Sequence, residues 1–136
     1  MKNQSENSIT TIKVVDCLVK INLQIENLNK DCAKAFNIGL NQWLILTEIK
    51  NMPGTSAQRL AREIGVHAST LTQSLKRLVN KKWIMIIDDP RDGRRKKIFL
   101  TDKGNDILTK TDENRNDIDA MAIKALTWIG EQVKAF

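Results

Sequence analysis

Residues 91–97 combine a high density of positive charge with residues that form turns. Five of these seven residues are cationic, namely Arg91, Arg94, Arg95, Lys96 and Lys97. Pro90 and Gly93 favour a turn, and short apolar runs lie on both sides, at residues 83–87 and 98–100. This pattern predicts a β-hairpin with a charged tip. Such a ribbon has the size and charge to enter a DNA groove and contact phosphates.

The residues just before this hairpin predict a helix with one polar face, over residues 68–82. Its apolar residues recur at helical spacing, at Leu71, Leu75, Leu78 and Val79. The polar residues that lie away from this stripe are Ser69, Thr70, Gln73, Lys76, Arg77 and Asn80. Glutamine pairs with adenine and arginine with guanine or phosphate, while hydroxyls suit phosphates and base edges. The polar face is therefore a candidate for reading DNA sequence.

A shorter helix is predicted ahead of that polar helix, over residues 56–64. Thr55 and Gln58 have the spacing of a capping box, with Thr55 as the N-cap, and Gly65 permits a sharp turn after the helix. A short helix, a turn, a polar-faced helix and a basic hairpin together predict a winged helix-turn-helix. In this arrangement the polar helix enters the major groove and the hairpin, or wing, reaches the adjacent minor groove.

Long helices are predicted at both ends of the chain, which makes the fold mainly α with a small β-hairpin. The first covers residues 9–36, with apolar residues three or four apart at Ile9, Ile12, Val15, Leu18, Ile21, Ile25, Leu28, Cys32 and Phe36. A second helix is predicted at residues 40–51, and two more at 101–119 and 120–136. So long an amphipathic helix cannot bury its apolar stripe within so small a domain. It indicates a partner helix, for instance from a second chain.

The composition fits a single globular domain and gives no support for an enzyme. The chain has 136 residues, 41% hydrophobic and 28% charged, with a net charge of +6. It shows no nucleophile–base pair, no phosphate-binding glycine loop and no Cys/His cluster with zinc spacing, so we predict no catalytic site, cofactor or metal. No apolar run has the length of a membrane span and no signal sequence is evident, which predicts a cytoplasmic protein without membrane contacts.

Two segments carry a resemblance to a known family. Residues 69–78 read Ser-Thr-Leu-Thr-Gln-Ser-Leu-Lys-Arg-Leu, and residues 89–104 contain Asp-Pro-Arg-Asp-Gly-Arg-Arg followed by a strand ending Leu-Thr-Asp-Lys-Gly. Both segments, and the order of predicted elements over nearly the whole chain, resemble the MarR family of bacterial transcriptional regulators. The resemblance implies that Arg94 is the wing-tip arginine in the minor groove and that Asp92 orients it. It places Thr70, Thr72, Gln73 and Arg77 on the recognition helix.

These considerations give two sets of candidate DNA-binding residues. The recognition-helix set is Ser69, Thr70, Thr72, Gln73, Lys76 and Arg77. The wing set is Arg91, Asp92, Arg94, Arg95 and Lys96. Two positions depart from the family pattern: Trp83 stands where a glycine usually follows the recognition helix, and His67 stands where a Ser, Asp or Thr cap is usual.

The resemblance also implies an assembly and a mode of regulation. About residues 9–36 and 105–136 would form dimerisation helices, and about 40–104 the DNA-binding lobe. The homodimer would bind a pseudo-palindromic operator in double-stranded DNA. A repressor is expected in preference to an activator. In relatives, small and often aromatic anions bind between the two regions, so an effector of this class is an expected partner.

Two alternatives remain open at the level of sequence. Some relatives sense peroxide through a cysteine of the first helix, which makes Cys17 a redox candidate, with Lys13 or Lys20 one turn away to lower its pKa. The activating tyrosines of those relatives are missing, because the chain contains no tyrosine. Both Cys17 and Cys32 therefore also fit the simpler role of small buried hydrophobes. The second alternative is a winged-helix module that binds another protein.

Overall fold

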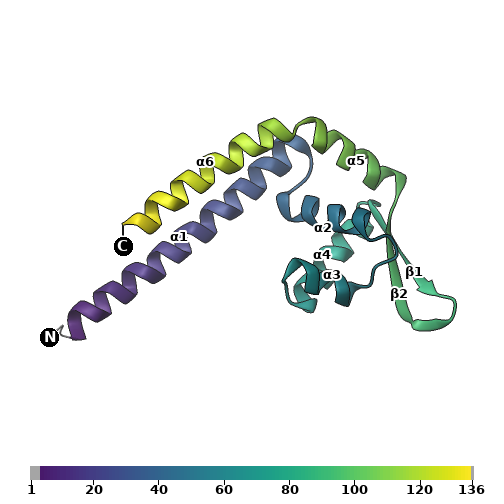
Figure 1. Cartoon of the computed structure of the whole chain (residues 1–136), viewed down its shortest axis with the longest axis horizontal. Helices are drawn as coiled ribbons and strands as arrows, with labels where there is room; N and C mark the ends of the chain where they lie inside the picture. The colour runs from purple at the N-terminus through teal and green to yellow at the C-terminus, as the bar shows by residue number, and fades with distance from the viewer. Residues whose placement is uncertain (1–3, 136) are drawn as a thin grey trace.

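The computed structural model of the chain describes residues 4–135, with side chains described for residues 13–135. Six helices and one two-stranded sheet follow one another within this part of the chain (Figure 1). The elements are α1 Gln4–Phe36, α2 Leu40–Asn51, α3 Ala57–Ile64, α4 Ala68–Asn80, β1 Ile84–Asp89, β2 Asp92–Leu100, α5 Asp102–Glu113 and α6 Arg115–Lys134. The predicted fold, mainly α with a β-hairpin wing, is confirmed.

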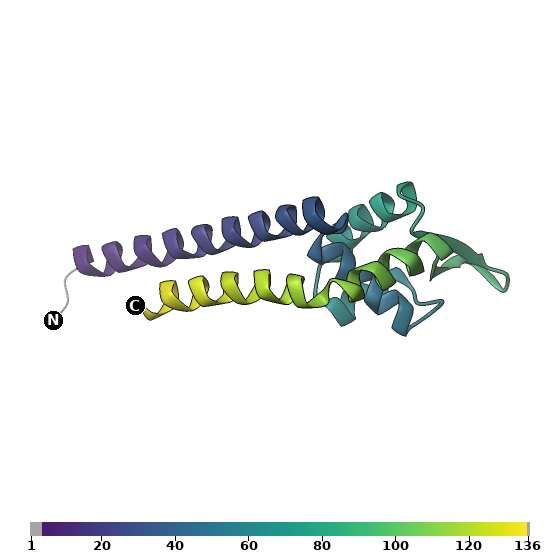
Figure 2. The ribbon, with the colours of Figure 1, turned by 90° about the horizontal axis from the view of Figure 1, so that it is seen from above.

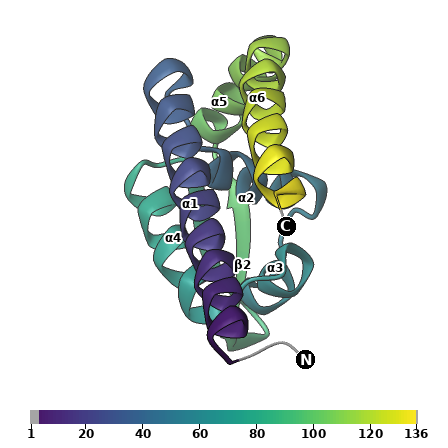
Figure 3. The same cartoon turned by 90° about the vertical axis from the view of Figure 1, so that its left-hand side faces the viewer.

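The molecule has a compact lobe and a pair of long helices that extends away from it. The lobe contains α2, α3, α4, the hairpin and α5, whereas α1 and α6 run alongside each other to one side (Figures 1 and 2). The view along this pair shows α1 and α6 next to one another in front of the lobe (Figure 3). Within residues 4–135, no helix is both long and apolar enough to cross a membrane.

One apolar cluster holds the lobe together. Leu46 and Ile49 of α2, Leu60 of α3, Leu71 and Leu78 of α4, and Ile98 of β2 are the most deeply buried residues there. The predicted stripe of α4 is confirmed at Leu71, Leu75 and Leu78, but Val79 remains 39% exposed. Burying a Leu or Ile side chain stabilises a fold by about 1.5–3 kcal/mol, so this cluster fixes how α4 and the hairpin are presented.

The third helix starts one residue later than predicted. Its N-cap is Ser56, whose hydroxyl accepts a hydrogen bond from the Arg59 amide at 3.1 Å. Thr55 is instead buried and bridges the hairpin, because its carbonyl accepts from the Ile98 amide at 2.9 Å. The capping box predicted for Thr55 is therefore wrong. A long-range bridge holds Thr55 in an extended conformation beside β2.

The boundary between the last two helices also differs from the prediction. The chain turns at Asn114, not near Asp119, and Asn114 both ends α5 and begins α6. Its amide donates to Thr111 at 3.1 Å, and its side chain bonds the Lys110 carbonyl at 2.9 Å. Asparagine closes a helix end readily because its side chain can replace a backbone partner. Residue 136, the predicted end of the last helix, lies outside the described residues.

Candidate nucleic-acid interface

The turn between α3 and α4 fixes the angle at which α4 leaves the lobe. Gly65 ends α3 in the left-handed conformation at φ 81°, as the predicted sharp turn requires. His67 is the N-cap of α4 and is exposed, but its side chain makes no capping hydrogen bond. Leu71 and Leu75, on the first turns of α4, are 1% and 4% exposed. The helix is therefore anchored on one side only.

All six candidate residues of α4 lie on its exposed side. They are Ser69, Thr70, Thr72, Gln73, Lys76 and Arg77. The Thr72 hydroxyl donates to the Ala68 carbonyl at 2.8 Å, which leaves its oxygen lone pairs free to accept a bond. The structure thus brings the predicted recognition residues together on one helix face, and buries none of them.

The end of α4 closes without the glycine that is usual there. Lys82 takes the left-handed conformation at φ 62°, its amide donates to Val79 at 2.9 Å, and the Trp83 amide donates to Leu78 at 3.1 Å. These two bonds form a Schellman motif. Our placement of the missing glycine at Trp83 is thus wrong by one residue, and α4 ends at Asn80 rather than Lys82. Trp83 is buried in the core beneath the hairpin.

Replacing Lys82 with glycine is expected to raise the free energy of unfolding by about 1 kcal/mol, because a side chain in the left-handed region is strained. Thermal or urea denaturation followed by circular dichroism measures this change. The matched control is Lys81→Gly, since Lys81 has φ −76° and its ammonium lies 4.5 Å from the centre of the Trp83 ring. That control should lose stability. A loss for Lys82→Gly as well would contradict the prediction.

The hairpin is an antiparallel pair with an irregular end. Ile84 pairs with Leu100 and Asp88 with Lys96, but Asp89 pairs with Asp92. Residues 93–95 therefore bulge out of β2, and Pro90 and Arg91 form the turn. The Asp89 carboxylate accepts from the Arg91 amide at 2.9 Å and stabilises this turn. The cationic run thus lies in the bulged strand as well as in the tip.

Asp92 contacts the two arginines of the bulge in different ways. One carboxylate oxygen accepts from the Arg94 backbone amide at 3.0 Å, and the other lies 3.8 Å from Nε of Arg95. The ion pair is therefore made with Arg95, whereas the resemblance assigns Asp92 to the orientation of Arg94. Both partners of this pair are well exposed, so it contributes little to stability. The hydrogen bond from the Arg94 amide to Asp92, and not the ion pair, holds the backbone that carries Arg94.

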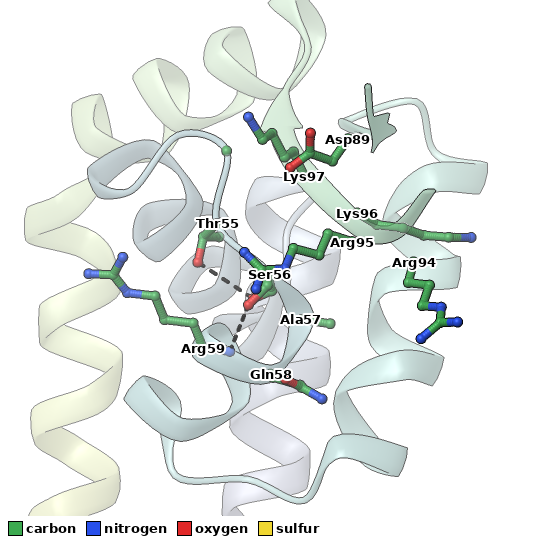
Figure 4. A pocket seen from close by; sticks show the side chains of 11 residues that line it. Thr55, Ser56, Ala57, Gln58, Arg59, Asp89, Arg94, Arg95, Lys96 and Lys97 are labelled. Carbon is green, nitrogen blue, oxygen red and sulfur yellow. Dashed lines mark hydrogen bonds between the residues drawn. The ribbon is translucent and has the colours of Figure 1, made fainter. Parts of the chain in front are cut away.

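A basic groove separates the bulged strand from the start of α3. On the hairpin side it is lined by four cations and one carboxylate, namely Arg94, Arg95, Lys96, Lys97 and Asp89, and residues 54–59 line the other side. Figure 4 shows Arg95 extending over the start of α3, while Arg94 and Lys96 extend to the other side. Two cations of this groove, Lys97 and Arg59, are absent from our candidate sets. Lys97 could have been included, because it belongs to the same cationic run.

The two cysteines have different surroundings. Cys32 is buried, and burial, with a smaller contribution from Asp31, raises the pKa of its thiol. Cys17 is partly exposed on α1. Lys20, one of the two lysines named with Cys17 under the redox alternative, is paired with Asp16 at 2.8 Å, and this contact raises the pKa of Lys20. The interpretation of Cys32 as a small buried hydrophobe is confirmed. Cys17 is only partly buried, so the same interpretation fits it less well.

A helix-turn-helix whose second helix presents a polar face, followed by a hairpin packed on the same core, defines a winged-helix protein. A sequence model of the MarR family matches residues 36–95, from the end of α1 into β2. The resemblance to the MarR family of transcriptional regulators that was seen in the sequence is confirmed over this segment. No curated protein matches the chain in sequence.

Solved structures of several regulators share the fold. A cysteine-to-serine mutant of MarR from E. coli in complex with operator DNA has a TM-score of 0.67 at 19% identity, covering 97% of this chain and 99% of that chain. The repressor CouR bound to a 23-mer DNA duplex has 0.61 at 19%, covering 81% and 87%. PcaV from Streptomyces coelicolor with its natural ligand has 0.57 at 22%, covering 62% of this chain and 60% of PcaV, less than two thirds of its length. At these identities the likeness concerns the fold.

Proposed function

We propose that this protein is a sequence-specific DNA-binding repressor that acts as a homodimer on a pseudo-palindromic operator. The proposal is carried by one observation: the α4 polar face and the cationic wing are both exposed, and both belong to elements packed on one core. The α4 face supplies sequence preference, and the wing cations supply affinity that depends on salt. The DNA-bound structures of CouR and MarR, which share the fold, support this use of the lobe.

The homodimer is supported by apolar side chains that the single chain leaves exposed. On α1, Val15 and Leu18 of the predicted stripe are 54% and 61% exposed, while on α6, Ile123 and Leu126 are 62% and 65% exposed. Such a surface is unfavourable in water and marks an interface. A second copy of the chain provides a matching surface, and two-fold symmetry then sets two α4 helices against successive turns of DNA.

Selection of bound sequences from a random duplex pool tests the proposed function. We expect a two-fold symmetric consensus with half-sites about one helical turn apart, roughly 10 base pairs. An enriched pool without symmetry would contradict the dimeric mode. No retention of duplex DNA at low salt would contradict DNA binding itself and would favour a protein-binding module.

Release of DNA by a small aromatic or anionic effector is part of the proposal. The fold shared with PcaV, which was solved with its natural ligand, supports it. A thermal-shift screen of small organic anions, repeated in the presence of operator DNA, tests this part separately. Compounds that stabilise the free protein and weaken DNA binding are expected. Loss of DNA binding only after peroxide treatment, prevented by Cys17→Ser, would support the redox alternative instead.

Replacing Arg94 with alanine is expected to weaken binding on operator and random duplex alike, by about tenfold at moderate salt. Arg94 sits in the exposed bulge, and the proposed phosphate and minor-groove contacts do not depend on the major-groove sequence. The slope of log affinity against log salt should become shallower by about one unit. Fluorescence anisotropy at several salt concentrations measures both effects. A loss confined to the operator would contradict this role.

Replacing Gln73 with alanine is expected to relax discrimination at particular base pairs. A bidentate contact contributes about 1–3 kcal/mol of discrimination against a wrong base. Binding to random duplex and the salt slope should remain close to those of the wild type, because no phosphate contact is lost. Competition between operator variants substituted at single positions measures the change. Equal losses on operator and random duplex would rule out a readout role for Gln73.

A further inference from the structure

A second groove, with an apolar floor, lies between α4 and the wing. Its volume is about 440 Å³. Val79 and Leu75 of α4 and Ile86 and Ile98 of the hairpin provide apolar lining, with Ala57 at the start of α3. Val79 and Ile86 are 39% and 38% exposed, although each belongs to an element packed on the core. The groove therefore leaves apolar side chains open to solvent between the two proposed DNA-contacting elements.

Positive charges border this apolar floor. Lys76 of α4 and Lys96 of β2 line opposite sides of the groove, and both are exposed. No acidic side chain lines it. An apolar floor between two ammonium groups matches a chain that alternates apolar sugar carbons with phosphate anions. One strand of DNA has this chemistry, with one phosphate about every 3.4 Å along the helix axis.

The geometry of DNA places a strand at this position if both elements bind as proposed. The major and minor grooves of a duplex are separated by a sugar–phosphate backbone. A protein that inserts α4 into one groove and its wing into the next must straddle that backbone. The surface that faces the backbone is then the groove between α4 and the wing, and this groove is continuous with both DNA-contacting faces.

We propose that this groove seats the sugar–phosphate strand that separates the major from the minor groove. This inference rests on the proposed DNA-binding function. Val79 and Ile86 contact deoxyribose carbons, and Lys76 and Lys96 contact the flanking phosphates. Lys76 is thereby a phosphate contact and not a base-reading residue. Val79 and Ile86 are positioning residues that set the depth of α4 in the major groove.

The hairpin offers a matched pair of substitutions as a test. Ile86 pairs with Ile98 and lines the groove, whereas Ile87 pairs with Lys97 on the opposite face of the ribbon. Their exposures are 38% and 46%, so replacing either with threonine, which keeps the β-branched shape, should perturb folding to a similar small extent. Ile86→Thr is expected to weaken DNA binding about fivefold on operator and random duplex alike, and Ile87→Thr less than twofold.

The salt dependence separates the two kinds of contact. Ile86→Thr should leave the slope of log affinity against log salt unchanged, while Lys96→Gln should reduce it by about one unit. Val79→Thr, on the other side of the groove, should behave like Ile86→Thr. Thermal unfolding of each variant establishes that the lobe is intact before binding is compared.

The outcomes distinguish this inference from the proposed function. If the wild type binds no duplex at low salt, the proposed function fails. If the wild type binds duplex DNA, and Ile86→Thr and Ile87→Thr bind it equally well, then the groove does not bind the sugar–phosphate strand and the inference is wrong. The inference is also wrong if Ile86→Thr changes only the binding of the amphipathic dye anilinonaphthalene sulfonate and leaves DNA binding intact. The groove would then bind a small molecule and not the DNA strand.

Discussion

Replacing Gly104 with alanine is expected to lower the free energy of unfolding by about 3 kcal/mol, a large effect for the addition of a single methyl group. Gly104 is buried in the first turn of α5, and a Cβ atom there would overlap the backbone carbonyl of Trp83. Overpacking against a side chain typically costs about 1–3 kcal/mol, and a backbone atom has less room to yield. The melting temperature should therefore fall by roughly 10 °C.

The contacts around Gly104 explain why the chain brings α5 so close to the hairpin. The Thr101 hydroxyl donates to the Lys82 carbonyl and accepts from the Gly104 amide at 3.0 Å, and the Thr101 amide donates to the Trp83 carbonyl at 3.0 Å. The Leu-Thr-x-x-Gly motif thus joins the two ends of the hairpin to the start of α5. The role of this motif is to hold the wing in place, whereas the cations of the wing contact DNA in the proposed function.

A second glycine gives a matched control for this prediction. Gly130 lies within α6, and a Cβ atom there would meet no other atom within 4 Å. Gly130→Ala should therefore be neutral or stabilising, by up to about 1 kcal/mol, because alanine favours a helix over glycine. Urea denaturation at a fixed protein concentration compares the two variants. Equal stability of Gly104→Ala and the wild type would show that α5 can shift without cost.

Local patterns predicted those features of the fold that local interactions determine. The periodic placement of Leu71, Leu75 and Leu78 predicted α4 and its buried side, because a helix must turn one stripe toward the core. The turn at Gly65 was also predicted locally, because glycine readily adopts the left-handed conformation that ends a helix. The exposed polar face of α4 followed directly, since residues opposite a buried stripe face the solvent. The locations of the recognition-helix candidates were therefore accessible from sequence.

Features that depend on distant parts of the chain were missed. Thr55 reads as a helix cap until Ile98, 43 residues later, pairs with its backbone. Lys82 adopts a conformation that favours glycine because Trp83 must enter the core directly afterwards. Asp92 and Arg95 are only three residues apart, but their ion pair depends on the bulge that β2 forms where it pairs with β1. The contacts of the candidate residues with DNA stay predictions, because they concern a partner molecule.

Introducing a charge on the exposed apolar side of α6 is expected to dissociate the proposed homodimer. Leu126 is 65% exposed in the single chain, and an interface residue occurs twice in a two-fold symmetric dimer. Leu126→Glu would remove two apolar contacts and bury two carboxylates, which together should weaken the dimer by about 4 kcal/mol, or roughly 1000-fold in dissociation constant. Leu18→Glu on α1 should act similarly, and sedimentation equilibrium measures both.

The matched control places the same charge on an exposed apolar residue of the wing. Met85 is 44% exposed and lies in the lobe, so Met85→Glu should leave the dimer intact. The dissociated variants should keep the fold of the lobe and bind single half-sites weakly, because the energetic gain from two linked recognition helices is lost. Their affinity for the full operator should then approach that for a half-site. If both Leu126→Glu and Leu18→Glu sediment as the wild type does, these faces of α1 and α6 are not the dimer interface, and the spacing of the two recognition helices must be set elsewhere.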